Sequence, residues 1–452
     1  MSEGQAVRRE ESKQDYPLQA VPQGARRSDA TIALILLGFT FWVGSMYAGG
    51  QVGPGFSFWN MVGIVTLGSA MLGAYVCVLS VAAQRSGLNT VLLARFSFGE
   101  KGSKIVDSLL GFTQIGWYAW AIALPGVILS ELMGQGWFIP LVIFFTLAFT
   151  WTAYIGISAL AILSRVAVPT MIVLIGISLW LAVGDAGGLS ELTGIGGSTD
   201  VGIALALTLI IGTFISGGTQ ITNWTRFCST TRGAVIGGFA AFTLGNGLFI
   251  FAGAMGALVY QEADLTRVLG IQGLLAAGLV LMLLNIWTTA DRTVYAFSVA
   301  GANLFRTEKR RGLVIGGALI GIVLAISGFY NFLESYLILL GTFIPPVGAI
   351  IAADYFVKWR SRIPDLDSVS LPAFNWVGIV TYFVACLVAQ FSPGVPPVNG
   401  LIAAFVLYIA LNKIAEKSGA TPESVIKQPE LREPEQQAER EQAEREQEPV
   451  RE

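Results

Sequence analysis

The sequence predicts an all-α polytopic membrane protein with about twelve transmembrane helices. Only 13% of the 452 residues are charged, about half the share found in a soluble domain. Apolar runs of about 20 residues recur from Thr31 to Asn412, and each is long enough to cross a bilayer. Backbone groups in the bilayer are satisfied only in helices or closed barrels. The runs lack the alternation of barrel strands, so we expect helices.

Three regions differ in composition. We expect a cytoplasmic N-terminal tail over 1–30, a transmembrane domain over 31–412 and a charged, low-complexity cytoplasmic tail over 413–452. The last tail is almost free of apolar residues, which is typical of a disordered segment or a solvated helix. The expected spans are 31–52, 58–83, 104–130, 137–161, 163–184, 200–223, 234–259, 271–302, 313–328, 333–354, 374–392 and 395–412.

The basic residues support this number of spans. Of the 28 Lys and Arg residues, 26 lie in the two tails, in the even-numbered loops or at the span ends that border these loops. The odd-numbered loops hold only Arg267, and Arg292 is the one basic residue deep within a span. Because Lys and Arg concentrate in cytoplasmic loops, we expect a multi-pass protein of the cell membrane with both termini in the cytoplasm.

Composition excludes several classes of protein. The net charge of -2 gives no sign of nucleic-acid binding. The chain has no histidine, and Cys77, Cys228 and Cys386 lack the spacing of metal ligands. The first thirty residues are polar and the first apolar run is too long for a signal peptide, so the first span is expected to be an uncleaved anchor.

Glycines gather in two of the expected spans. Paired Gly-interrupted spans in corresponding positions of two repeats indicate a binding site. The first and sixth spans correspond if spans one to five repeat as six to ten. The alternative is that the glycines permit close helix packing, and the glycines alone leave both interpretations open. They are Gly38, Gly44, Gly49, Gly50, Gly53 and Gly55 in and after the first span, and Gly212, Gly217 and Gly218 in the sixth.

Polar and aromatic residues lie at mid-membrane depth in three spans. Gln114 and Trp117 share a helix face in the third span because they are three residues apart. For each polar residue taken singly, the alternative is a hydrogen bond that joins two helices. Together, the groups suit a flat, uncharged ligand, because rings stack on a heterocycle and an amide matches the edge of a base. The others are Phe214 and Ser216 in the sixth span, and Asn285, Thr288 and Thr289 in the eighth.

Several strings of residues resemble the nucleobase-cation symporters, and within that family the bacterial cytosine permeases. The likeness runs from about Val21 to Lys413. The strings are Leu-Leu-Ala-Arg-Phe-Ser-Phe-Gly at 92–99, Thr-Gln-Ile-Gly-Trp at 113–117, Phe-Ile-Ser at 214–216, Leu-Asn-Ile-Trp-Thr-Thr at 284–289, Ile-Pro-Pro-Val-Gly at 344–348 and Ala-Asp-Tyr at 353–355.

The resemblance implies a fold, a function and a substrate site. The fold would be leucine-transporter-like, with five plus five inverted helices and two further helices. The chain would be a secondary active transporter that imports a nucleobase by cation symport with alternating access. Cytosine is the first candidate for this nucleobase. By resemblance, the base lies between Trp117 and Phe214 and bonds through its edge to Gln114, with Ser216 and Asn285 close by.

The resemblance also implies a sodium ion between the broken first span and the eighth. The matching ligands are the carbonyls of Gly38 and Phe41, with oxygens from Asn285, Thr288 and Thr289. Uncharged oxygens suit a hard cation. No other cofactor is expected.

Two residues depart from the pattern of cytosine permeases. Ala290 stands where they usually carry Asn, and Arg292 stands beside Asp291 where they carry a neutral residue. An arginine within a span costs about 2.5–3.5 kcal/mol on insertion scales, so we expect a partner such as Asp291, Glu334 or Asp354.

Other functions are weighed against this one. The first alternative is a proton-coupled importer of a purine, a hydroxymethylpyrimidine or a related cyclic amide, with a carboxylate such as Asp291 taking the proton. An enzyme would need a nucleophile with a base, or a metal cluster, and the spans show neither. A channel is disfavoured because an enclosed stacking site predicts saturable transport.

Overall fold

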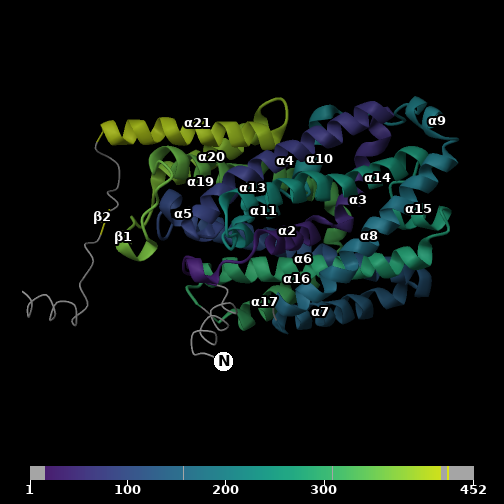
Figure 1. The fold of residues 1–452 in the computed structure, drawn as a ribbon, viewed down its shortest axis with the longest axis horizontal. Helices are drawn as coiled ribbons and strands as arrows, with labels where there is room; N and C mark the ends of the chain where they lie inside the picture. The colour runs from purple at the N-terminus through teal and green to yellow at the C-terminus, as the bar shows by residue number, and fades with distance from the viewer. Residues whose placement is uncertain (1–15, 156, 308, 419–424, 427–452) are drawn as a thin grey trace, which may run out of the picture.

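The computed structural model describes residues 16–155, 157–307, 309–418 and 425–426. Its long helices run along the longest axis of the molecule (Figure 1). Two short loop helices, α9 (Leu189–Gly194) and α15 (Leu265–Ile271), lie at one end, and α5 (Thr90–Phe98) lies at the other end. This is the arrangement expected when successive loops alternate between the two sides of a membrane.

The twelve predicted spans correspond to helices of the structure. In chain order these are α2 (Asp29–Thr40) with α3 (Val43–Val52), α4 (Phe58–Ser86), α6 (Ser103–Met133), α7 (Phe138–Ile155), α8 (Ile157–Asp185), α10 (Ile203–Gly212) with α11 (Ile215–Thr219) and α12 (Thr222–Thr225), α13 (Thr231–Phe239) with α14 (Asn246–Tyr260), α16 (Leu275–Leu304), α17 (Arg310–Ile326), α18 (Leu333–Phe343) with α19 (Pro345–Ala353), α20 (Trp376–Phe391) and α21 (Pro396–Lys417).

Length and composition confirm a polytopic membrane protein. Among the described residues, six helices are long and apolar enough to cross a membrane, or eight if each of two bent pairs is one span. Three shorter apolar helices and the 30-residue α16 bring the number to twelve.

The two bent pairs are the first and sixth spans, as the glycines predict. The axis turns by 52° between α2 and α3 and by 54° between α10 and α11. Phe41 and Trp42 form the first break, and Trp42 has extended backbone angles. Thr213 and Phe214 form the second break. Both breaks leave backbone groups without helical partners.

Short elements complete the fold. Residues Val369–Ser370 (β1) and Val425–Ile426 (β2) pair as antiparallel strands. The rest of the predicted C-terminal tail beyond Ser418, and residues 1–15 of the N-terminal tail, lie outside the described residues. The 3-10 helices are Gln23–Ala25, Gly53–Gly55, Gln135–Trp137, Phe329–Phe332 and Leu366–Ser368, and π-helical turns occur at Ala240–Gly245 and Asp354–Lys358.

The predicted boundary between the fourth and fifth spans is wrong. The sequence prediction ends the fourth span at 161 and begins the fifth at 163, whereas α7 ends at Ile155 and α8 begins at Ile157. Between 153 and 164 the chain has no charged residue and no proline. Helix α8 therefore runs through the predicted break at 161–163, and the apolar residues of this stretch do not mark where the fourth span ends.

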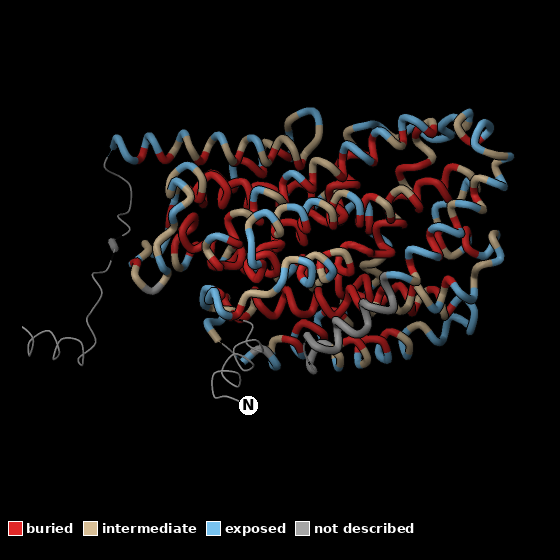
Figure 2. Tube along the Cα trace, viewed as in Figure 1, coloured by how far each residue is buried: buried red, intermediate tan, exposed pale blue. Residues whose placement is uncertain are grey.

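Glycines also permit close packing, as the alternative interpretation held. A Cβ atom on Gly49 of α3 would lie 2.0 Å from the carbonyl oxygen of Ile250, and one on Gly253 of α14 would lie 1.9 Å from that of Met46. The glycines thus mark both the two broken spans and close helix contacts, at different positions. The segments at the centre of the bundle are mostly buried, whereas α21 at its edge is exposed along much of its length (Figure 2).

Candidate functional site

A small cavity lies where the two broken spans meet α6 and α16. It has a volume of about 20 Å³, which is room for about one water molecule. Four of the five predicted substrate residues line it, namely Gln114, Trp117, Phe214 and Ser216. The other lining residues are Phe39, Trp42, Thr213, Gly217, Thr289 and Thr293. The structure therefore brings residues from the third, sixth and eighth spans together.

Helix α6 contributes an amide and an indole ring to this cavity. Trp117 donates a hydrogen bond from Nε1 to the Ser216 hydroxyl of α11 at 3.1 Å. Gln114 is only 2% exposed. Its side-chain amide makes no hydrogen bond to any residue that the structure describes, although buried amides are normally paired. The cavity wall thus carries a donor and an acceptor that are available to a ligand.

Two further aromatic residues of the wall escaped the sequence analysis. The rings of Trp42 and Trp117 meet edge to face with centroids 6.4 Å apart. The rings of Phe39 and Phe214 do so at 5.2 Å. Phe39 lies in the last turn of α2, and Trp42 lies in the break that follows. An aromatic residue in an apolar span does not by itself indicate a binding site. The position of these two residues beside the Gly-rich segment of the first span could have indicated that they line one.

Asn285, the fifth predicted substrate residue, is not among the lining residues. Its Oδ1 accepts from the backbone N–H of Val43 at 2.9 Å, and its Nδ2 donates to the carbonyl of Phe41 at 2.6 Å. The amide therefore spans the break on both sides of Trp42. It satisfies backbone groups that the broken helix leaves unpaired and positions the Trp42 ring on the cavity wall.

The predicted sodium ligands converge around the same break. Phe41 is held by Asn285, as described above, and the Thr288 hydroxyl donates to the carbonyl of Asn285 at 2.8 Å. The Thr289 hydroxyl lines the cavity and has no hydrogen-bond partner in the described part of the chain. The carbonyl of Gly38 accepts from Nη1 of Arg292 at 2.9 Å. A guanidinium group therefore lies among these oxygens.

Of the three carboxylates expected near Arg292, Asp291 is its neighbour in α16 and interacts with its charge. Oδ1 of Asp291 accepts from the Thr152 hydroxyl of α7 at 2.7 Å. Asp354 accepts from the hydroxyl of Tyr408 at 2.5 Å, and Glu334 is exposed.

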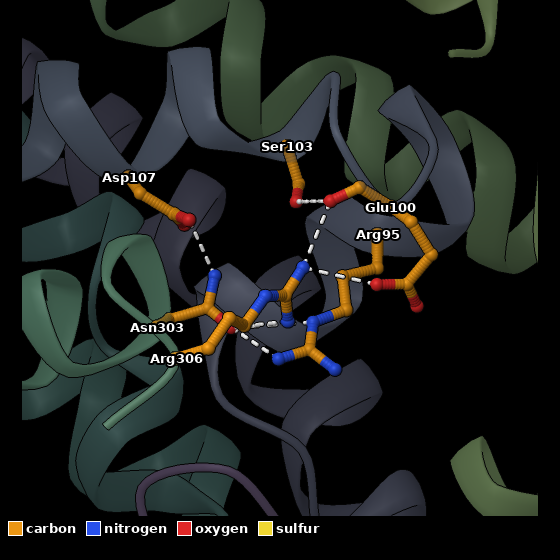
Figure 3. Close-up of polar contacts among 6 residues, drawn as sticks. All are labelled: Arg95, Glu100, Ser103, Asp107, Asn303 and Arg306. Carbon is orange, nitrogen blue, oxygen red and sulfur yellow. Dashed lines mark hydrogen bonds and ion pairs between the residues drawn. The ribbon is translucent and has the colours of Figure 1, made fainter. Parts of the chain in front are cut away.

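A second polar cluster joins α5, α6 and α16 at the end of the bundle where α5 lies (Figure 3). Asn303 is at its centre. Its Oδ1 accepts from Nε of Arg95 at 3.2 Å and from Nη1 of Arg306 at 3.1 Å, and its Nδ2 donates to Asp107. Arg306 also pairs with Glu100 at 2.9 Å. In the sequence, Arg95 is a basic residue of the second loop and part of the string at 92–99; in the structure it ties the loop helix α5 to α16.

Comparison with known families identifies the family of this chain. A family model described as permease for cytosine/purines, uracil, thiamine, allantoin matches residues 20–408. The chain belongs to this family. It is 37% identical over 398 residues to the cytosine permease of Escherichia coli strain K12. The alignment covers 88% of this chain and 94% of that permease. The chain is also 24% identical over 429 residues to the hydantoin permease of Microbacterium maritypicum, covering 87% of this chain and 88% of that one.

Solved structures share the fold of this permease family member. Mhp1, a nucleobase-cation-symport-1 family transporter solved closed with bromovinylhydantoin bound, has a TM-score of 0.78 at 21% identity, covering 88% of this chain and 95% of Mhp1. A Na⁺-coupled sialic acid symporter has a TM-score of 0.64 at 13% identity, covering 93% and 95%. The fold is the leucine-transporter-like arrangement of five plus five inverted helices with two further helices, as predicted.

Proposed function

We propose that this chain is a secondary active importer of a nucleobase, with cytosine as the first candidate. The observation that carries the proposal is the unpaired amide of Gln114 on a buried wall of aromatic rings. An amide offers a donor and an acceptor side by side, as the edge of a base requires. Trp117 and Phe214 supply faces on which a flat ring stacks.

The size of the cavity supports alternating access. Its volume of about 20 Å³ is much smaller than a base, so Trp117 and Phe214 must separate to admit one. The breaks after Thr40 and Gly212 are positions at which a helix can bend without breaking regular hydrogen bonds. Movement at the two breaks would open the cavity to one side of the membrane and then to the other.

The identity of the substrate is supported by relatives and by chemistry. The similar protein of Escherichia coli is a cytosine permease, and other relatives are a hydantoin permease and an allantoin permease. All these substrates are small rings that carry a cyclic amide group. A purine, a hydroxymethylpyrimidine or another cyclic amide is therefore the alternative substrate. We further propose that both tails, 1–30 and 413–452, are cytoplasmic, because basic residues gather on their side of the spans.

The coupling ion is a separate part of the proposal. The sequence favours sodium, held by Gly38, Phe41, Asn285, Thr288 and Thr289, with a proton as the alternative. The oxygens of these residues lie around the break between α2 and α3, which supports a cation there. Arg292 already donates a hydrogen bond to the carbonyl of Gly38, one of these five ligands, and this contact affects the choice between sodium and a proton.

Uptake of radiolabelled cytosine into proteoliposomes that contain the purified chain tests the proposed substrate. We expect saturable uptake that unlabelled cytosine inhibits. A panel of unlabelled uracil, purines, hydroxymethylpyrimidine and hydantoin ranks the alternatives by competition and by direct uptake. The absence of uptake for cytosine and for every compound of the panel would contradict the proposal.

A further inference from the structure

Arg292 lies at the point where the broken first span meets α16. Its Nη1 donates to the carbonyl of Gly38 at 2.9 Å and to the carbonyl of Thr288 at 2.7 Å. The side chain is only 2% exposed. A single nitrogen of a cation therefore bridges the two helices at one of the carbonyls predicted to hold sodium.

The end of α2 explains why a guanidinium is stable there. Helix α2 ends at Thr40, so the carbonyls of its last turn, including Gly38, lack the normal helical partners. They also carry the negative end of the helix dipole, which favours a cation. A guanidinium presents rigid N–H donors and has the weakly hydrated charge that suits a buried position.

The same contact disfavours a sodium ion. Sodium bound to the Gly38 carbonyl would lie in direct reach of the Arg292 charge, in a buried region where like charges repel strongly. The other predicted ligands are also engaged. Phe41 accepts from Asn285 at 2.6 Å, and Oδ1 of Asn285 accepts from Val43 at 2.9 Å. Of the five predicted ligands, only Thr289 has a side-chain oxygen without a partner in the described chain.

We infer that the guanidinium of Arg292 is a built-in cation that takes the place of sodium at this site, so that uptake by this chain does not require sodium. The inference rests on the proposed import of a nucleobase and concerns only its coupling ion. A tethered cation holds α2 against α16 as a bound ion would, but it cannot leave with the substrate. It therefore takes over the structural role of sodium but supplies no driving force, which leaves a proton, the alternative named above, as the coupling ion of the proposed importer.

Uptake in proteoliposomes with sodium replaced by choline at constant ionic strength and pH tests the inference on the parent protein. A coupled ion changes the affinity for its partner by about 5–150-fold. We expect the half-saturation concentration for cytosine to be the same with and without sodium. A half-saturation concentration that falls as sodium rises would overturn the inference, and the proposed import would stand.

Two variants test whether the site is a cation site at all. In Arg292→Ala the carbonyls of Gly38 and Thr288 are released, so we expect uptake to become sodium-dependent. Thr289→Ala in the same background should remove this gain. Arg95→Ala, which deletes another buried arginine in the Asn303 cluster, is the matched control and should stay indifferent to sodium. A folded, active Arg292→Ala variant that is indifferent to sodium would overturn the inference.

Thermal unfolding provides a measurement that does not depend on the substrate. An ion that binds only the folded state raises the melting temperature. We expect sodium, compared with choline at equal ionic strength, to leave the melting temperature of the parent unchanged and to raise that of Arg292→Ala. Stabilisation of the parent by sodium would overturn the inference even if no nucleobase were transported. If the parent protein took up no nucleobase in either the sodium or the choline medium, only the proposed function would be contradicted.

Discussion

The indole of Trp117 and the hydroxyl of Ser216 are joined by a hydrogen bond of 3.1 Å between the third span and the broken sixth span. The bond crosses the cavity wall and orients the ring beside Gln114. Trp117 can thus contribute to ligand binding in two ways, through the surface of its ring and through the position in which Ser216 holds the ring. Substitutions of Ser216 and of Trp117 separate the two.

Trp117→Ala is expected to weaken cytosine binding by about 1–3 kcal/mol, the value of one base–aromatic stack. Ser216→Ala removes the hydrogen bond but keeps the ring, so a smaller loss is expected. Equilibrium binding of radiolabelled cytosine to each purified variant measures both effects. Equal affinity of Trp117→Ala and the parent would contradict stacking on this ring.

Gln114→Leu is expected to lose recognition of the base edge at nearly constant side-chain volume. Because the bound base would then leave polar groups unpaired, the affinity should fall by about 1–3 kcal/mol. Competition binding with cytosine and related bases measures the change. If the variant binds cytosine as the parent does, Gln114 has only a structural role.

Asn285→Ala is expected to lower the stability of the protein. Its amide satisfies Phe41 and Val43 on both sides of the break, and each buried group left unpaired costs about 1–3 kcal/mol. Thermal unfolding of the purified protein reports the effect. Asn60→Ala changes an exposed asparagine of α4 and is the control. A melting temperature for Asn285→Ala equal to that of this control would argue against the role of the amide at the break.

Gly253→Ala is expected to disturb the packing of α14 on α3. The added Cβ would lie 1.9 Å from the carbonyl oxygen of Met46, and such overpacking typically costs about 1–3 kcal/mol. Gly63→Ala is the matched control, because no atom outside the adjacent backbone of its own helix lies within 4 Å of its added Cβ. We expect a lower melting temperature only for Gly253→Ala. Unchanged melting temperatures in both variants would show that α3 can shift away from α14 without loss of stability, and would contradict tight packing at Gly253.

The sequence predicts most of the fold because membrane spans have strong physical signals. Long apolar runs and the separation of basic residues mark twelve spans, and glycine density marks the two that bend. The boundary between the fourth and fifth spans was predicted wrongly because apolar residues run through 153–164 without a charge or a proline. The loop helix α5 was missed because its residues are mostly apolar but too few to form a span.

The candidate site could be predicted in part. Helical spacing places Gln114 and Trp117 on one face, and mid-membrane depth singles out Phe214, Ser216 and Thr289, so five of the lining residues were named from the sequence. The contacts of Asn285 and Arg292 depend on the backbone path at the break, which spacing along a helix does not specify. Thus the sequence indicates that Arg292 needs a partner, but not that the carbonyl of Gly38 is one.

A structure of the chain with cytosine bound is the most direct test of the central claim, that the cavity between the broken spans binds a nucleobase. We predict that the ring lies between Trp117 and Phe214, with its edge within hydrogen-bond distance of the Gln114 amide. A base bound elsewhere in the chain, or no bound base at a cytosine concentration that saturates uptake, would contradict the claim.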